Sequence, residues 1–196
     1  MPVRKVYGRH MVDGINYRSA DFVEYHKEFK ADKKVKSFTL PQVGDGQRRG
    51  KFGSLKAEVN GIIFDSVMEA RYYVYLLNQK AEKKIKTFDM QVSYELIPKL
   101  TDKVTGKKIQ ATNYIADFVI TDNKGKKTVV DVKGKETEVF RIKEKLFRYR
   151  YPDTDFICVQ WDKSEKSWRL LEEIKKDKRM KKLHKTLDKK KNKKTK

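Results

Sequence analysis

The sequence predicts a mixed α/β fold, and three observations carry this prediction. Two runs rich in β-branched and apolar residues, 114–121 and 128–133, flank the turn-forming segment 123–125, which indicates a β-hairpin. Helical patterns at 66–80 and 139–149 precede apolar strand-like segments. Strands and helices that alternate along a chain are typical of an α/β core.

The predicted elements can be placed in order along the chain. A first hairpin turns at Asn60-Gly61, and a helix begins at Ser66. The later elements are strands at 87–97, 114–121 and 127–133, a helix at 139–149 and a strand at 155–160. The segment 99–110, rich in Lys, Thr and Gly, is expected to be a long polar turn.

Asp117, Asp131 and Lys133 are the strongest candidates for chemistry. A three-residue loop at 123–125 sets Asp117 directly opposite Asp131, whereas a two-residue loop shifts the pairing by one. Facing Cβ atoms lie roughly 5 Å apart, and two carboxylates there repel by about 3 kcal/mol at an effective dielectric of about 20. A cation between them, or protonation of one carboxylate, removes this cost, and a divalent metal is the simplest answer. The simpler interpretation is an exposed Asp131–Lys133 ion pair on an edge strand.

Glu69 is a third acidic candidate, and it lies on a helix. Ser66 and Glu69 have the spacing of a capping box, in which the glutamate carboxylate returns to the backbone amide of the serine. Considered alone, Glu69 is better explained by the cap. The alternative is that Glu69 joins Asp117, Asp131 and Lys133 at a metal.

Five segments between Lys51 and Trp161 form an ordered set: Val59–Arg71, Gln91–Leu96, Tyr114–Phe118, Val130–Gly134 and Lys143–Pro152. This order resembles the PD-(D/E)XK nuclease superfamily, and within it a family of small phage-encoded endonucleases similar to Holliday-junction resolvases. Ala116 stands where the superfamily often has proline before the first aspartate. That proline is not a ligand, so the change removes no chemistry.

The resemblance implies a restriction-endonuclease-like core, a mixed central sheet flanked by helices, in an Mg²⁺-dependent DNA endonuclease. It implies that Asp117, Asp131, the Val132 carbonyl and Glu69 hold the Mg²⁺, for which Mn²⁺ can substitute. The metal would activate a water and stabilise charge on the scissile phosphate. Lys133 would neutralise that phosphate or orient the water.

Other polar side chains extend this expected site. Gln91, on the strand before the catalytic hairpin, would line it, and an ordinary solvent-facing glutamine is an equally supported alternative. The candidate DNA-binding side chains are basic residues flanking the core: Arg48, Arg49, Lys51, Lys143, Lys145 and Arg148. For the lysines of the 139–149 helix, the alternative is solvated helix charge.

The charge of the chain favours a polyanionic partner. The formal net charge is +21, and the segment 175–196 holds 13 Lys/Arg against 2 Asp. A basic helix that frays after Asp188 is expected there, with affinity for DNA phosphates; the alternative is a solubilising tail. The expected substrate is branched or double-stranded DNA, as in phage recombination or replication. A non-catalytic nucleic-acid-binding protein on a degenerate nuclease fold is the alternative, although the intact acid set favours the enzyme.

Histidine, cysteine and apolar content exclude several other classes. The three histidines lie outside 51–161, which argues against histidine-based nuclease chemistry. The single Cys158 permits neither an internal disulfide nor a zinc ribbon, and it suits a reducing host cytoplasm. No segment has the length and apolarity of a signal peptide or a membrane span, so no membrane partner is expected. The sequence leaves a homodimer open.

The N-terminal residues resemble the start of the core. Shifted by 47 positions, Val12–Ser19 overlies Val59–Ser66, and after a small gap 31–38 overlies 81–88. The arm is therefore predicted to be a degenerate repeat of 52–92, a hairpin followed by a helix from near Ser19. Phe22 takes the place of Glu69, so the copy is no second active site. The expected domains are 1–50 (arm and linker), 51–172 (nuclease core) and 173–196 (basic tail).

Overall fold

The structure is a computed structural model that describes residues 10–13, 15–17, 20–42, 54–134 and 136–194. The chain divides into two compact units, Met1–Lys84 and Ile85–Lys196, and each is described by itself. The described residues form a mixed α/β fold with four helices and a mixed five-stranded central sheet. The coarse fold class predicted from the sequence is confirmed.

Two successive hairpin–helix segments make up the first unit. β1 (His10–Val12) pairs antiparallel with β2 (Ile15–Tyr17), and α1 (Ala20–Ala31) follows. β4 (Ala57–Val59) pairs antiparallel with β5 (Ile62–Phe64), and α2 (Val67–Ala81) follows. Both copies of the predicted repeat therefore fold as a hairpin followed by a helix. The predicted start of the first helix, Ser19, lies outside the described residues.

The two hairpins turn in the same way but use their turn side chains differently. Asp13 and Asn60 occupy equivalent positions, with φ angles of 50° and 54°. Asp13 Oδ2 lies 2.9 Å from Nε2 of the buried His26 and 2.5 Å from Lys30 Nζ. The Asn60 side-chain oxygen Oδ1 instead accepts a hydrogen bond from the Lys36 amide at 2.7 Å. The first turn is thus tied to its own helix, and the second to the loop after α1.

One short strand joins the two copies. β3 (Phe38–Thr39) follows α1 and pairs antiparallel with β4, which gives the sheet order β3-β4-β5. A bidentate ion pair between Arg71 of α2 and Glu28 of α1 adds a polar bridge, with N–O distances of 3.0 and 3.1 Å. The first copy is therefore packed on protein, as the repeat hypothesis requires.

A five-stranded sheet in the order β12-β11-β10-β9-β6 forms the second unit. β10 and β11 are parallel, and the other neighbours are antiparallel. The strands are β6 (Thr87–Ile97), β9 (Thr112–Thr121), β10 (Lys127–Val132), β11 (Asp155–Asp162) and β12 (Ser167–Leu170). The four strands predicted for this region are confirmed. β10 lies in the middle of the sheet and not at its edge.

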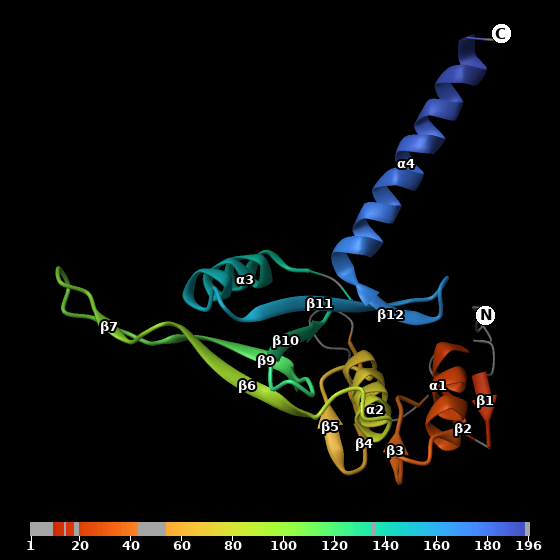
Figure 1. Cartoon of the computed structure of the whole chain (residues 1–196), viewed down its shortest axis with the longest axis horizontal. Coiled ribbons are helices and arrows are strands. Elements are labelled where there is room, and N and C mark those ends of the chain that lie inside the picture. The colour runs from red at the N-terminus through yellow and green to blue at the C-terminus, as the bar shows by residue number, and fades with distance from the viewer. Residues whose placement is uncertain (1–9, 14, 18–19, 43–53, 135, 195–196) are drawn as a thin grey trace, which may run out of the picture. The chain divides into compact units, whose positions relative to one another are not determined.

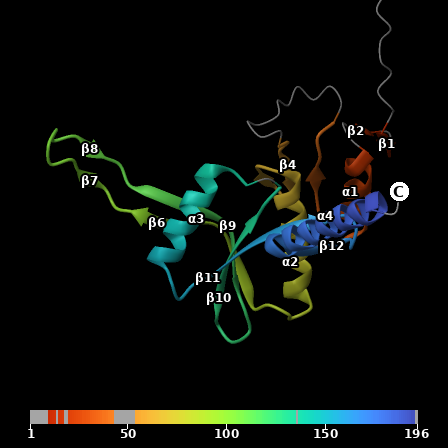
Figure 2. The ribbon, with the colours of Figure 1, turned by 90° about the horizontal axis from the view of Figure 1, so that it is seen from above.

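Helix α3 (Glu138–Arg150) connects the two parallel strands and crosses the sheet (Figure 2). Its N-cap is Thr137, whose hydroxyl accepts the Phe140 amide at 3.1 Å. The helix buries Phe140 and Phe147. The apolar cluster that these two side chains share with the sheet also contains Leu96, Tyr114, Ala116, Val119, Val129 and Phe156. This core lies directly beside the predicted catalytic hairpin.

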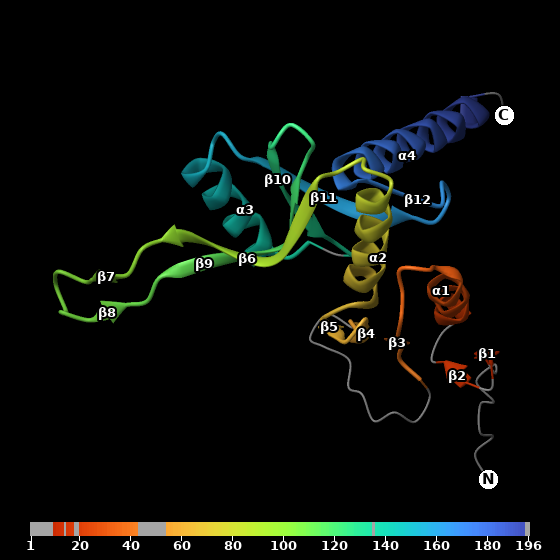
Figure 3. The same cartoon turned by 60° about the horizontal axis from the view of Figure 1, so that its bottom comes forward.

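Two segments differ from the sequence-based expectations. The expected polar turn 99–110 contains two further strands, β7 (Leu100–Thr101) and β8 (Lys108–Ile109), which prolong the β6–β9 pair into a ribbon (Figure 3). The basic helix α4 (Leu171–Lys194) continues past Asp188, where fraying was expected. Lysine is a good helix former, so the lysine-rich end sustains the helix. No helix within the described residues is long and apolar enough to span a membrane.

Candidate active site

Asp131 is a buried carboxylate with a polar partner at each oxygen. Its side chain is only 2% exposed, on the central strand β10. The Tyr114 hydroxyl donates a hydrogen bond to Oδ2, and the Lys133 ammonium contacts Oδ1. Among the described residues, Oδ1 accepts no conventional hydrogen bond besides this ion-pair contact. The exposed edge-strand ion pair that the sequence allowed is therefore wrong.

Asp117 lies beside Asp131 because the turn sets the strand register. Val130 pairs with Phe118, so Asp117 and Asp131 occupy the next opposing positions. The turn is the predicted one: the Asp122 amide donates to the Lys126 carbonyl at 3.0 Å around 123–125. Asp117 Oδ2 then accepts the Val132 amide at 2.8 Å. A side-chain carboxylate thus binds a backbone amide just beyond the last regular pair of the two strands.

The alternation of β9 breaks at this point. Ala116 and Val119 belong to the same apolar cluster although they are three residues apart, and Phe118 is also buried. On the neighbouring strand, Gln91 lies between the pairs Met90–Phe118 and Val92–Ala116 and has a φ of 53°. A positive φ is uncommon for a residue other than glycine, and such strain often marks a functional site. Gln91 is exposed, opposite Asp117.

The electrostatics of the site couple four groups. Burial alone lowers the pKa of Lys133, but the nearby carboxylates of Asp131 and Asp117 outweigh it, and the net pKa is raised. Burial, followed by the charge of Asp131, raises the pKa of the Tyr114 hydroxyl. Lys133 is therefore held as an ammonium and Tyr114 as a neutral donor. Burial also raises the pKa of Cys158 to about 12, so this neighbour on β11 is a thiol and not a nucleophilic thiolate.

Lys133 is held by an aromatic ring as well as by charge. Its Nζ lies 4.5 Å from the centroid of the Phe140 ring, and the side chain is 23% exposed. Phe140 comes from the first turn of α3, so the helix that covers the core also positions the lysine. The lysine side chain is therefore largely, but not completely, covered.

Glu69 belongs to the first unit and forms the predicted cap. Its amide donates to Ser66 Oγ at 3.1 Å, and the Ser66 hydroxyl donates to Glu69 Oε1 at 2.8 Å. The return bond therefore uses the serine hydroxyl, where the sequence predicted the serine amide. The local role of Glu69 is that of a helix cap, and its role as a metal ligand stays a prediction.

The expected DNA-binding residues differ in their surroundings. Lys143 Nζ donates to the Asn113 carbonyl at 2.7 Å, and Arg148 binds Glu144 and the Phe156 carbonyl. Lys145 is exposed on α3. Arg48, Arg49 and Lys51 lie outside the described residues. Among the helix candidates, Lys143 and Arg148 already serve the fold.

Tyr114 and Phe140 are site residues that sequence reasoning missed. Strict alternation places Tyr114 on the face opposite Asp117, and only the break in β9 brings its hydroxyl to Asp131. Phe140 carries no polar signal. A tyrosine inside an apolar strand, three residues before a candidate aspartate, was the one hint that the sequence offered.

The donor set fits a hard divalent cation. Two carboxylates face one lysine, which leaves an excess negative charge around the buried Asp131. Mg²⁺ characteristically uses one or two carboxylates and retains several waters, so it needs no large protein cage. Within the described residues, no three His, Cys, Asp or Glu side chains form a group able to hold a metal. Asp117 and Asp131, with backbone oxygen and water, are the ligands that this arrangement provides.

Comparison with known protein families shows which family the chain belongs to. A family model described as "Protein of unknown function (DUF1064)" matches residues 49–168, more than half of the sequence. The chain belongs to this family. The DUF1064 match contains the candidate residues Glu69, Gln91, Asp117, Asp131 and Lys133. It begins just before the second hairpin–helix copy and ends within β12. No curated protein matches the sequence.

Proposed function

We propose that this DUF1064 protein is an Mg²⁺-dependent DNA endonuclease with a PD-(D/E)XK, restriction-endonuclease-like core. One observation carries the proposal: the buried Asp131 lies beside Asp117 and Lys133, with a partly open face on the lysine. Burying the Asp131 carboxylate costs free energy, and clusters of charged groups that bear such a cost are often functional sites. The sheet around them also has the βαβ connection, β10–α3–β11, on which such a site can be built.

The proposed roles follow from the surroundings of each side chain. Asp117, Asp131 and the Val132 carbonyl would hold Mg²⁺, with Glu69 as a further ligand and Mn²⁺ as a substitute. The bound metal supplies a water of lowered pKa and stabilises negative charge on the phosphate. Lys133, kept protonated by the two aspartates, would place its ammonium on the phosphate oxygen.

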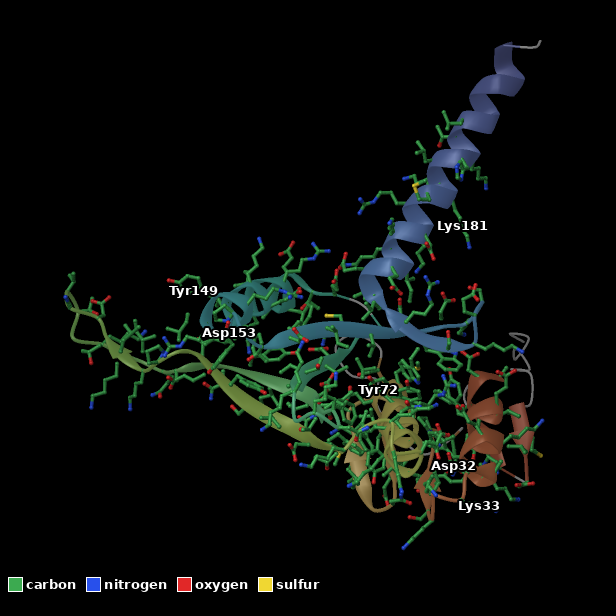
Figure 4. All side chains as sticks on the ribbon, in the orientation of Figure 1. Asp32, Lys33, Tyr72, Tyr149, Asp153 and Lys181 are labelled. Atoms are coloured by element: carbon green, nitrogen blue, oxygen red, sulfur yellow. The ribbon has the colours of Figure 1, made fainter. Side chains whose placement is uncertain are left out.

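Charge supports nucleic acid as the substrate. The chain carries a net +21, and α4 presents exposed basic side chains such as Lys181, labelled in Figure 4. Contacts to phosphates are blind to sequence, which suits a substrate recognised by shape. Branched recombination or replication intermediates are the proposed substrates, in the host cytoplasm.

A non-catalytic nucleic-acid-binding protein is the second candidate, and two observations favour it. Lys133 already neutralises Asp131, and Glu69 is engaged in its helix cap. In such a protein the acidic cluster would be structural and would need no metal.

One cleavage experiment decides between the two. Purified protein is incubated with linear, flap and four-way-junction DNA, with Mg²⁺ or with EDTA. The nuclease proposal expects Mg²⁺-dependent cleavage by the wild type and a loss of at least ~100-fold in Asp131→Asn, the scale of one lost electrostatic group, with DNA binding retained.

Asp155→Asn is the matched control. It removes one carboxylate from the same sheet, at an exposed ion pair with Lys126, and should cleave like the wild type. Wild-type-like cleavage by Asp131→Asn would sink the assignment. DNA binding with no cleavage on any substrate would favour the second candidate.

A further inference from the structure

The β6–β9 pair continues as a thin ribbon beyond the body of the sheet. After the pair Ile97–Thr112, the chain forms the pairs Leu100–Ile109 and Thr101–Lys108 and then turns. From Ile97 to Thr101 the strand extends by about 13 Å at the usual rise of about 3.3 Å per residue. Nearly every residue in 97–111 is exposed. Figure 3 shows the ribbon extending from the end of the β6–β9 pair. The ribbon therefore buries little against its own unit.

The ribbon has a preformed tip. The Asp102 carboxylate accepts the amides of Val104 and Thr105 at 2.9 and 2.7 Å, and the Asp102 amide donates to the Lys107 carbonyl at 2.9 Å. Gly106 takes the positive φ of 68° that the turn requires. These bonds lower the pKa of Asp102, chiefly through the Thr105 amide, so its charge serves the turn. Val104 is 93% exposed at the apex.

Helix α3 fixes the base of the ribbon on both strands. The Tyr151 hydroxyl donates to the Glu95 carbonyl at 3.0 Å, and Lys143 Nζ donates to the Asn113 carbonyl at 2.7 Å. Glu95 and Asn113 are paired with each other. The ribbon is thus tied to the helix that positions Lys133.

The charged side chains of the ribbon are almost all positive. Its lysines are Lys99, Lys103, Lys107 and Lys108, against the single acid Asp102. Among the described residues, none of these four ammonium groups has an ion-pair partner. Cross-strand partners share a face, so Thr101 and Lys108 lie on one face and the exposed Leu100 and Ile109 on the other.

We propose that the β7–β8 ribbon is an arm that lies in a groove of double-stranded DNA, with its lysines on the flanking phosphates. This inference rests on the proposed function only in taking nucleic acid as the substrate. The major groove, about 12 Å wide, admits a two-stranded β-ribbon. Val104 at the apex is exposed and uncharged, so it can enter the groove without desolvating a charge of its own. A second copy of this chain is a poorer occupant because its charge of +21 repels the cationic ribbon.

The test compares two variants of the full chain that have equal net charge. The ribbon variant changes Lys99, Lys103, Lys107 and Lys108 to Gln, and the control variant changes the exposed Lys86, Lys124, Lys127 and Lys166 to Gln. Binding to duplex and single-stranded DNA is measured without divalent metal across a range of salt. Because no cleavage occurs, failure of the nuclease proposal leaves this test intact.

If the ribbon lies in a groove, the ribbon variant should bind duplex DNA differently from the control variant. The ribbon variant should lower the slope of log affinity against log salt by up to about 3.6, at about 0.9 for each phosphate that is no longer neutralised, and should shorten the footprint on duplex DNA. The control variant should change the slope less and keep the footprint. Circular dichroism and sedimentation of both variants should match the wild type.

Three results would contradict the proposal that the β7–β8 ribbon lies in a DNA groove. The two variants could weaken duplex binding equally, which would mean that charge acts diffusely. The ribbon variant could weaken duplex and single-stranded binding alike, which would exclude a groove. It could instead change the oligomeric state while binding DNA like the control, which would make the ribbon a subunit contact.

Discussion

Lys133 supplies the positive charge that the buried Asp131 requires. Its ammonium contacts the carboxylate, and the Phe140 ring lies against it. Removing the cation leaves a buried charge without compensation, which costs on the order of 3 kcal/mol or more. A divalent ion that binds only the folded state can restore part of that stability. The lysine and the metal would therefore have a shared stabilising effect as well as separate chemical roles.

Lys133→Met separates these roles because methionine retains packing on Phe140 without the charge. We expect a lower melting temperature without metal, a larger rise on adding Mg²⁺ than in the wild type, and a loss of at least ~100-fold in cleavage rate. Thermal melts, calorimetric Mg²⁺ titration and single-turnover cleavage measure the three. A collapse of metal affinity would mean that Lys133 holds the site together and does not act on phosphate.

Tyr114 makes the site sensitive to alkaline pH. Its folded pKa lies above the usual 10.0, and the pKa of Lys133 lies above the usual 10.5. The folded state therefore keeps both protons where the unfolded state releases them. By linkage, the stability from each group is complete below its usual pKa and is lost as the pH rises above it.

Tyr114→Phe should remove the tyrosine part of this dependence. We expect it to lower the free energy of unfolding at pH 8 by about 1.5–3 kcal/mol, the range for a hydrogen bond to a charged group. The decline in stability above pH 10 should be shallower than in the wild type. Denaturant unfolding from pH 8 to 11 measures both, and parallel pH profiles would show that Tyr114 ionises freely in the fold.

At the residue scale, the sequence was informative where a turn fixes the register. The Asn123–Gly125 turn was enough to bring Asp117 beside Asp131, because strand pairing propagates from the loop. The contact of Tyr114 with Asp131 could not be predicted from the sequence. It depends on a break in the alternation of β9, and a continuous apolar run gives no sign of such a break. Burial of Asp131 followed from the central place of β10, which requires the strand order.

Among the elements, helices and buried strands have clear sequence signals, and exposed strands do not. The helix predicted at 139–149 spans 138–150, and the strand predicted at 87–97 has those bounds. The ribbon at 99–110 has the sequence pattern of a turn, because its side chains face solvent and show no apolar alternation. β12 and α4 follow each other without a loop, which removed the usual boundary signal.

Helix α4 has an anchored start and an exposed basic remainder. Leu171 and Ile174 are buried, Arg169 binds Asp177 at 2.8 Å, and Lys175 binds Glu136 at 2.7 Å. Beyond these anchoring residues the described side chains from Lys176 to Leu187 are exposed. The course of α4 can be followed in Figure 1. The part of α4 that does not pack on its own unit therefore begins after its second turn.

Truncation after Lys178 should keep the anchor and remove the basic remainder. The slope of log affinity against log salt should fall by about 0.9 for each DNA phosphate that α4 no longer neutralises. Cleavage position on a given substrate should not change, because the candidate carboxylates lie on β9 and β10. Salt-dependent binding and product mapping measure the two. An unchanged slope would show that α4 does not touch DNA.

For the whole molecule, the candidate ligands are divided between two units. Glu69 belongs to Met1–Lys84, whereas Asp117, Asp131 and Lys133 belong to Ile85–Lys196. The expected core, 51–172, spans this boundary, as does the DUF1064 match at 49–168. Element order could be predicted from the sequence. The division at residues 84 and 85 could not, because no change in composition marks it.

Calorimetric Mg²⁺ titration of the fragment 85–196 and of full-length Glu69→Gln tests whether Glu69 is a ligand. If it is, both should bind Mg²⁺ about tenfold or more weakly than the intact chain, by analogy with the removal of coordination partners. Glu82→Gln is the control, since it removes a carboxylate near the end of α2 at an exposed ion pair with Lys84. Wild-type affinity in both proteins would confine Glu69 to its helix cap.

The strand that follows each of the first two helices pairs with a hairpin that lies later in the chain. β3 joins β4 and β5, and β6 joins β9 and β10. The β4–β5 hairpin thus receives a strand from the copy that precedes it. A chain built this way can lengthen at its amino end by duplication without rethreading any sheet downstream. With Phe22 at the place of Glu69, the first copy would add packing without an acid, while the second copy keeps one.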